Sequence, residues 1–203
     1  KRVAERENGK KITGESKIAP VVLKTKSRIK KIHLQPENVE PYEDVISALG
    51  SADLIVIGPG SLYTSIIPNL LTDRVSEAVA KSKAKKMYIA NVMTQEGETD
   101  GLNIADHVKA ILNHCNDRKI VDLVIVNKEK IPDYLIQKYA KQNSESLYLT
   151  KDQRNELEKM KIKIIEGNFL KFNGEYVRHN EEKLAKVIID NYNYLFYIHL
   201  LLY

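Results

Sequence analysis

A four-residue apolar run that stops at a glycine-rich turn constrains this chain more than any other segment. Leu54–Ile57 is followed at once by Gly-Pro-Gly and then by a hydroxyl-rich, helix-like segment. This order is typical of a buried strand that ends in a tight turn, where glycines let a ligand approach the main chain. Free N–H groups at the start of the following helix favour anions. We therefore expect a phosphate or nucleotide site here, with a tight turn and a helix cap as the alternative. The expected contact residues are Gly58, Gly60, Ser61, Thr64 and Ser65.

Short apolar runs alternate with amphipathic segments along the rest of the chain. Strands are predicted at residues 28–34, 54–57, 87–90, 123–126 and 162–165. Helices are predicted at residues 73–81, 103–114 and 131–139, from Pro41 to Gly50, and after the caps Thr150 and Asn180. A capping box is expected at residues 150–153. The alternation predicts an α/β fold with a mostly parallel sheet covered on both faces, which binds ligands past the carboxyl ends of its strands.

The N-terminal residues predict a small β-hairpin. Residues 2–7 and 10–13 flank Asn8-Gly9, a pair that supplies the positive φ angles of a type I′ turn. Val3 and Ile12 are expected to face a neighbour. Because the chain starts at Lys1 with strand-like residues, we expect it to be part of a longer protein.

Composition limits the function classes. The 203 residues suit one domain, and the net charge of +5 is mild. The basic runs at residues 24–31 and 81–86 lack interleaved aromatic side chains, which favours a solvated surface over nucleic-acid binding. A single cysteine, Cys115, excludes an internal disulfide and fits a reducing compartment. The apolar tail at residues 194–203 is too short to cross a bilayer, and could pack on the domain, on a partner or on nothing.

A second polar strand end follows residues 87–90. Eleven residues, 91–101, separate this strand from the next helix, and loops of this length in compact domains are often functional. The candidate ligand contacts in it are Asn91, Thr94 and Gln95. Glu98 and Asp100 could hold Mg²⁺ beside a phosphate, and an acidic surface loop is the alternative.

A third polar segment, residues 177–180, precedes the last predicted helix. Arg178 at a helix start is poorly placed for the helix dipole, which suggests an anionic partner, with a surface arginine as the alternative. His107 and His179 could act as acid–base groups or be structural. No Walker loop, dinucleotide fingerprint or GxSxG elbow is present, so no catalytic residue is assigned.

These segments match a known family. Residues 58–71 closely resemble the signature of the YvcK-type gluconeogenesis-factor proteins, whose wider CofD-like superfamily includes 2-phospho-L-lactate transferase. Residues 12–16, 91–101 and 177–180 resemble three further signatures in the same order. The match runs from about Ala4 to Tyr192, so residues 1–192 resemble the C-terminal portion of a CofD-like domain, and the tail at 193–203 lies outside it. The family's glycine-rich GGTG loop belongs to the N-terminal half and is not in this sequence.

The resemblance implies a cytoplasmic bacterial protein with a Rossmann-like three-layer α/β/α fold. It also implies binding of a uridine-diphosphate sugar such as UDP-N-acetylglucosamine, and a role in carbon metabolism, cell shape and wall synthesis. Arg178 matches an arginine implicated in nucleotide-sugar binding in that family, and Tyr139 is the best match for an upstream tyrosine.

Two functions follow, with an interaction module that docks through the apolar tail as a third class, and all stay open at this point. The first is a nucleotide-sugar-binding regulator without a certain cofactor, since no nucleophile–base pair is apparent. The alternative is a Mg²⁺-dependent phosphotransferase of the 2-phospho-L-lactate transferase type. We expect no nucleic-acid partner and no membrane span, and a homodimer is a further expectation, for instance through the apolar tail.

Overall fold

The structure is a computed structural model that describes the backbone of residues 1–201 and the side chains of residues 1–192. What the predicted tail at 193–203 packs on therefore lies outside the described side chains. Within the part of the chain that is described, none of the helices has the length and apolar character that a bilayer span needs.

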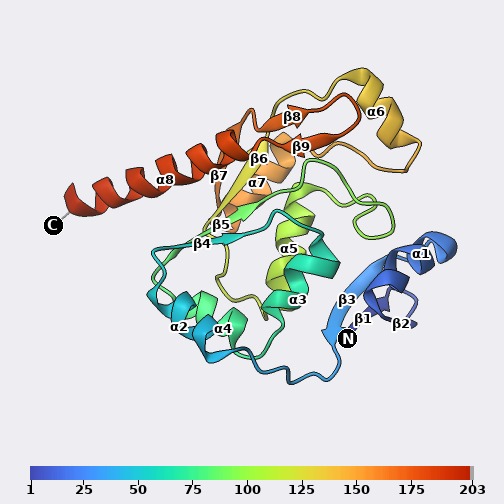
Figure 1. The fold of residues 1–203 in the computed structure, drawn as a ribbon, viewed down its shortest axis with the longest axis horizontal. Helices are drawn as coiled ribbons and strands as arrows, with labels where there is room; N and C mark the ends of the chain where they lie inside the picture. The colour runs from blue at the N-terminus through green and yellow to red at the C-terminus, as the bar shows by residue number, and fades with distance from the viewer. Residues whose placement is uncertain (202–203) are drawn as a thin grey trace.

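A four-stranded parallel sheet forms the centre of the protein (Figure 1). Its order is β4 (Leu54–Ile57), β5 (Lys85–Ile89), β6 (Leu123–Asn127) and β7 (Lys163–Gly167). In register, Val56 lies beside Met87, and Met87 beside Leu123. The predicted α/β fold with a mostly parallel sheet is confirmed.

The two faces of the sheet bury alternate residues of each strand, because successive side chains of a strand point to opposite faces. One face contributes Tyr88 and Val124 to a large cluster with residues of α4 (Val75–Lys81), α5 (Ile104–His114) and α7 (Lys151–Lys159). The other contributes Met87, Leu123 and Ile125 to a smaller cluster with Leu184 of α8 (Glu181–Leu201). Helices thus cover both faces, as expected for three layers.

The N-terminal residues form a separate three-stranded antiparallel sheet, which Figure 1 shows beside the main sheet. Its order is β2 (Lys11–Thr13), β1 (Arg2–Arg6) and β3 (Ile29–Leu34), and α1 (Glu15–Thr25) packs on it. The hairpin is confirmed, but the type I′ turn is wrong. Only Gly9 has a positive φ, of 76°, and its N–H donates to Arg6 O at 2.9 Å. The loop has three residues, and a type I turn followed by a left-handed glycine closes such a loop.

Several helices begin or end one or two residues away from the predicted positions. The helix expected from Pro41 to Gly50 is α2 (Glu43–Ser51), which Tyr42 precedes and which includes Gly50. The helix expected from residue 73 begins at Val75. No helix is predicted from the sequence at α1, which tolerates Pro20 in its interior and buries Ile18 and Val22 at helical spacing. Asn180 does cap α8, because its Oδ1 accepts from Lys183 N at 2.9 Å.

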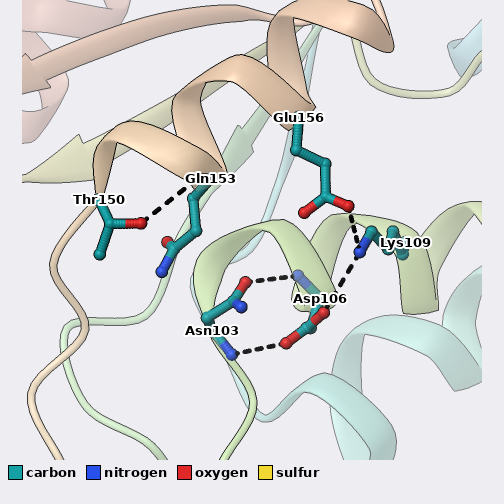
Figure 2. Close-up of polar contacts among 6 residues, drawn as sticks. All are labelled: Asn103, Asp106, Lys109, Thr150, Gln153 and Glu156. Atoms are coloured by element: carbon teal, nitrogen blue, oxygen red, sulfur yellow. Dashed lines mark hydrogen bonds and ion pairs between the residues drawn. The ribbon is translucent and has the colours of Figure 1, made fainter.

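Two helix N-termini lie side by side where α5 meets α7 (Figure 2). Asn103 and Asp106 form a complete capping box at the start of α5. Thr150 accepts from Gln153 N at 3.3 Å, but no bond returns from the Gln153 side chain, so the predicted capping box is only half formed. Lys109 bridges Asp106 at 3.5 Å and Glu156 at 2.5 Å, which ties the two helices together.

Removing the α5 cap is expected to destabilise the protein moderately. Asn103→Ala should lower the free energy of unfolding by about 1 kcal/mol, the usual effect of losing an N-cap. Asn103→Asp keeps a hydrogen-bond acceptor at the same place, so its free energy of unfolding should stay close to that of wild type. Denaturant titration of the three proteins checks this, and an equal loss in both variants would contradict the capping role.

Candidate functional site

A cleft of about 690 Å³ opens at the carboxyl ends of β4 and β5. We call it the β4–β5 cleft. Its walls are the loops that follow these two strands, the hairpin of β8 (Leu170–Phe172) and β9 (Val177–His179), and α6 (Asp133–Ala140). Seven of the ten residues predicted to contact a ligand line it: Gly60, Ser61, Asn91, Thr94, Gln95, Tyr139 and Arg178.

Hydrogen bonds hold the walls of this cleft against one another. Asn91 Nδ2 donates to Gly60 O at 2.9 Å and joins the two strand-end loops. His179 Nε2 bonds Ala90 O at 3.2 Å and ties β9 to the end of β5. Val177 N donates to the Tyr139 hydroxyl at 3.2 Å, which ties β9 to α6. Segments far apart in the chain therefore form one pre-organised cleft.

Arg178 enters the cleft from a strand. The prediction that it stands at a helix start is wrong, because it lies in the middle of β9 and α8 begins three residues later. Its guanidinium carbon lies 5.7 Å from the centre of the Tyr176 ring. Within the described residues it has no carboxylate partner, so its charge remains available to a ligand.

Gly58 and Ser65 line a different hollow. They face an apolar groove of about 650 Å³ between β4, α2 and α4, and this groove shares only Pro59 and Gly60 with the β4–β5 cleft. Gly58 has φ 87°, and a Cβ there would lie 3.2 Å from Ile89 O. A glycine is thus required by the packing of the turn itself.

Thr64 does not line the cleft and lies where the helical segment begins. It is buried in a π-helical turn, residues Leu62–Ile66, that continues into α3 (Ile67–Leu70). Its hydroxyl donates to Glu98 Oε1 at 2.8 Å, and Gln95 Nε2 donates to the same oxygen at 3.0 Å. Burial raises the pKa of Glu98, while the Thr64 hydroxyl and the amides of Tyr63 and Thr64 lower it.

A buried carboxyl group lies at the predicted anion site of this helix start. The amides of Tyr63 and Thr64 lower the pKa of Glu98, but no hydrogen bond from either amide reaches it, and Glu98 Oε2 has no hydrogen-bond partner among the described residues. Donors stabilise a buried carboxylate, and here the Thr64 hydroxyl and the Gln95 amide supply them at Oε1.

Glu98 and Asp100, expected to hold Mg²⁺, both accept hydrogen bonds from the protein, Glu98 from Thr64 and Gln95 and Asp100 from within its loop. Asp100 Oδ2 accepts from Gly97 N at 2.8 Å, and neither carboxylate lines the β4–β5 cleft. Among the described side chains, no group of three or more His, Cys, Asp or Glu residues is placed to hold a metal ion. These two residues do not fit a magnesium site in this arrangement.

The two histidines considered for acid–base roles differ in position. His107 is fully buried in the core, with Nδ1 3.3 Å from the Tyr88 hydroxyl, and burial lowers its pKa to about 4. His179 lines the cleft, and burial lowers its pKa as well. His107 is therefore structural, and His179 is a neutral cleft residue.

The cleft is also lined by residues that the sequence did not single out as ligand contacts, among them Met93, Glu96 and Ser144. Ser144 belongs to a segment that pairs with the loop after β5, where Thr94 N donates to Glu145 O at 2.8 Å. A contact between residues fifty positions apart leaves no periodic signal in a single sequence.

Comparison with known proteins assigns the family. The family model described as 2-phospho-L-lactate transferase CofD matches residues 1–170. Gluconeogenesis factor from Bacillus subtilis is 40% identical over 92% of this chain and 56% of its own length. Gluconeogenesis factor from Halalkalibacterium halodurans is 40% identical over 92% of this chain and 55% of its own.

A solved structure agrees with the fold. The crystal structure of a UPF0052 family member from Bacillus halodurans has a TM-score of 0.85 and 40% identity, over 92% of this chain and 58% of that one. The chain spans about half the length of the curated relatives it matches. Because the family model covers most of the chain and three of the four sequence signatures lie where it matches, the chain belongs to the CofD family, alongside relatives named gluconeogenesis factor.

Proposed function

We propose that the β4–β5 cleft binds a nucleotide-sugar of the UDP-N-acetylglucosamine type. One observation carries the proposal: Arg178 and Tyr139 line the same cleft as Gly60 and Ser61, although they come from distant parts of the chain. A guanidinium pairs strongly with phosphate oxygens, and a glycine loop lets a diphosphate approach the main chain.

The polar groups of the cleft suit such a ligand. The Tyr139 hydroxyl already accepts a bond from Val177 N, so its own proton is free to be donated. Together with Arg178 it offers donors on the β9 side, where a diphosphate would lie. The cleft volume falls within the usual range for small-molecule sites.

Arg178 and its neighbours do not suffice for tight binding. Micromolar affinity requires about 8 kcal/mol, and a charge-assisted bond such as that of Arg178 contributes roughly 1.5–3 kcal/mol. We therefore propose that the glycine-rich loop expected from the family resemblance, which this sequence lacks, completes the site and contacts the rest of the nucleotide.

The names of the relatives support a role in carbon metabolism. Proteins about 40% identical to this chain carry the name gluconeogenesis factor. From the family resemblance, we propose that this chain takes part in the control of carbon metabolism, cell shape and wall synthesis, in the cytoplasm, by sensing a nucleotide-sugar.

Replacing Arg178 is expected to weaken binding. Arg178→Ala should raise the Kd for UDP-N-acetylglucosamine at least tenfold in calorimetric titration, because it removes the cation of the cleft. Lys171→Ala is the matched control. Lys171 lies opposite Arg178 on the same hairpin, so this variant also removes one positive charge. Unlike Arg178, Lys171 already has a partner, because its Nζ lies 2.6 Å from Glu181 Oε1. If the two variants raise the Kd equally, Arg178 does not contact the ligand.

The transferase alternative draws on the name of the family model. It requires that Mg²⁺ tightens nucleotide binding and supports transfer of a phosphate-bearing group. Titration with and without Mg²⁺, followed by a product assay, separates the two functions. Turnover of the nucleotide-sugar would count against a binding regulator.

A further inference from the structure

We propose that Tyr176 and Lys138 are positioning residues of the β4–β5 cleft, which hold the guanidinium of Arg178 ready for a phosphate group. Neither of the two lines the cleft. The inference rests on the proposed nucleotide-sugar binding and deepens it, because it explains how a long, flexible arginine is kept in place at the cleft without a carboxylate partner.

The ring of Tyr176 lies beside Arg178. Tyr176 directly precedes β9 and Arg178 is two residues further on, so both side chains leave the extended chain on the same side. Val177 between them points the other way and is buried in an apolar cluster with Leu135. The guanidinium carbon of Arg178 lies 5.7 Å from the centre of the ring. A cation at this distance is attracted to the negative face of an aromatic ring, which restricts where the guanidinium can lie.

The ring of Tyr176 is held in turn by α6. Lys138 Nζ lies 4.8 Å from the centre of the same ring and donates a hydrogen bond to Glu175 O at 3.0 Å. The next residue of the helix, Tyr139, accepts from Val177 N at 3.2 Å. Two neighbouring residues of one helix therefore fix the backbone on both sides of Tyr176.

This arrangement favours binding because it restricts Arg178 before a ligand arrives. An arginine side chain loses much rotamer freedom when a ligand fixes it, and a side chain that is already restricted loses less. The simpler alternative is that Tyr176 and Lys138 stabilise the β8–β9 hairpin and have no effect on the arginine. The two roles differ in what happens when Arg178 is absent, since a positioning residue acts only through the residue that it positions.

Matched pairs of variants separate the ring from the cation. Tyr176→Leu removes the ring, whereas Tyr176→Phe keeps it. Lys138→Met removes the amine, whereas Lys138→Arg keeps a cation and a hydrogen-bond donor. Lys141→Met is the control for loss of charge, because Lys141 lies at the end of the same helix and its side chain makes no ion pair or hydrogen bond within the described part of the chain.

Calorimetric titration with UDP-N-acetylglucosamine measures the effect on affinity. Tyr176→Leu and Lys138→Met should each raise the Kd about threefold, as expected for the loss of an exposed cation–π contact. Tyr176→Phe, Lys138→Arg and Lys141→Met should bind as wild type does. An unchanged Kd in Tyr176→Leu, or the same increase in Lys141→Met as in Lys138→Met, would overturn the inference.

A double-mutant cycle distinguishes positioning from hairpin stability. When Arg178 is already replaced by alanine, Tyr176→Leu should not raise the Kd further, because the ring has no guanidinium left to hold. A further threefold loss in that background would show that Tyr176 acts independently of Arg178 and would overturn its positioning role. If wild type does not bind the nucleotide-sugar at all, the proposed function fails instead.

A ligand-free measurement tests the contact in that case. The Hδ resonances of Arg178, assigned by their loss in Arg178→Ala, should move in Tyr176→Leu because the ring current is lost, and should stay near their wild-type positions in Tyr176→Phe. They should also move in Lys138→Met and not in Lys141→Met. Resonances that are unchanged in Tyr176→Leu would show that the ring does not hold Arg178.

Discussion

Gly97→Ala is expected to lower the free energy of unfolding by about 3 kcal/mol, through backbone strain of ~1–2 kcal/mol and overpacking of ~1–3 kcal/mol. Gly97 has φ 77°, which an alanine adopts only with strain. A Cβ at this position would lie 2.6 Å from Ala19 O and 2.8 Å from Ala19 Cα, both in α1. Backbone atoms cannot turn aside as a flexible side chain can, so α1 and the loop after β5 would have to separate.

Gly9→Ala is the matched control for this prediction. Gly9 has nearly the same φ, 76°, but a Cβ there would meet nothing within 4 Å. Gly9→Ala should therefore lower the free energy of unfolding by the backbone strain alone, about 1–2 kcal/mol. Denaturant unfolding of both variants measures the difference. Equal losses would show that the contact between Gly97 and α1 contributes nothing to stability.

Acidification is expected to destabilise the protein through His107 by about 3 kcal/mol, since its pKa falls from 6.5 in the unfolded chain to about 4 in the fold. The folded state binds fewer protons at this residue than the unfolded state does. The stability is therefore present above pH 6.5 and is lost as the pH falls toward 4. His107 is fully buried, so solvent does not screen the effect.

The measurement compares two variants over that pH range. Tyr88→Phe removes the hydroxyl that contacts His107 Nδ1 but leaves the histidine to titrate. Adding His107→Leu to Tyr88→Phe removes the titration without leaving a buried hydroxyl unpaired. Between pH 7.5 and pH 4, the free energy of unfolding of the double variant should fall by about 3 kcal/mol less than that of Tyr88→Phe. Parallel stability curves would contradict the assignment to His107, because all other titrating groups are shared.

Much of the fold was predictable from local patterns. Apolar runs such as Leu54–Ile57 predicted the strands of the parallel sheet, and Asn103 and Asn180 cap helices where helical periodicity begins. The hairpin at Asn8-Gly9 was predictable, but its turn type was not, because strand pairing decides how many residues the loop contains. The observed helix ends differ from the predicted ones for a similar reason, because tertiary packing competes with weak local preferences.

The candidate site was predictable in its residue types and less so in its geometry. Gly60, Asn91 and Gln95 were expected at strand ends, and they share a cleft because the strands are parallel. Ser65 was expected with them, yet it lines the separate groove, because a helical segment directs successive side chains to different sides.

What the sequence by itself determined is the set of parallel strands, the polar loops at their carboxyl ends and the family signatures in them. Only the tertiary structure decided that Arg178 reaches the cleft from a strand and that Glu98 turns inward to Thr64 and Gln95. The physical reason is that periodicity reports burial along one element. The partner of a hydrogen bond depends on which distant segment packs against that element, and a single sequence carries no record of it.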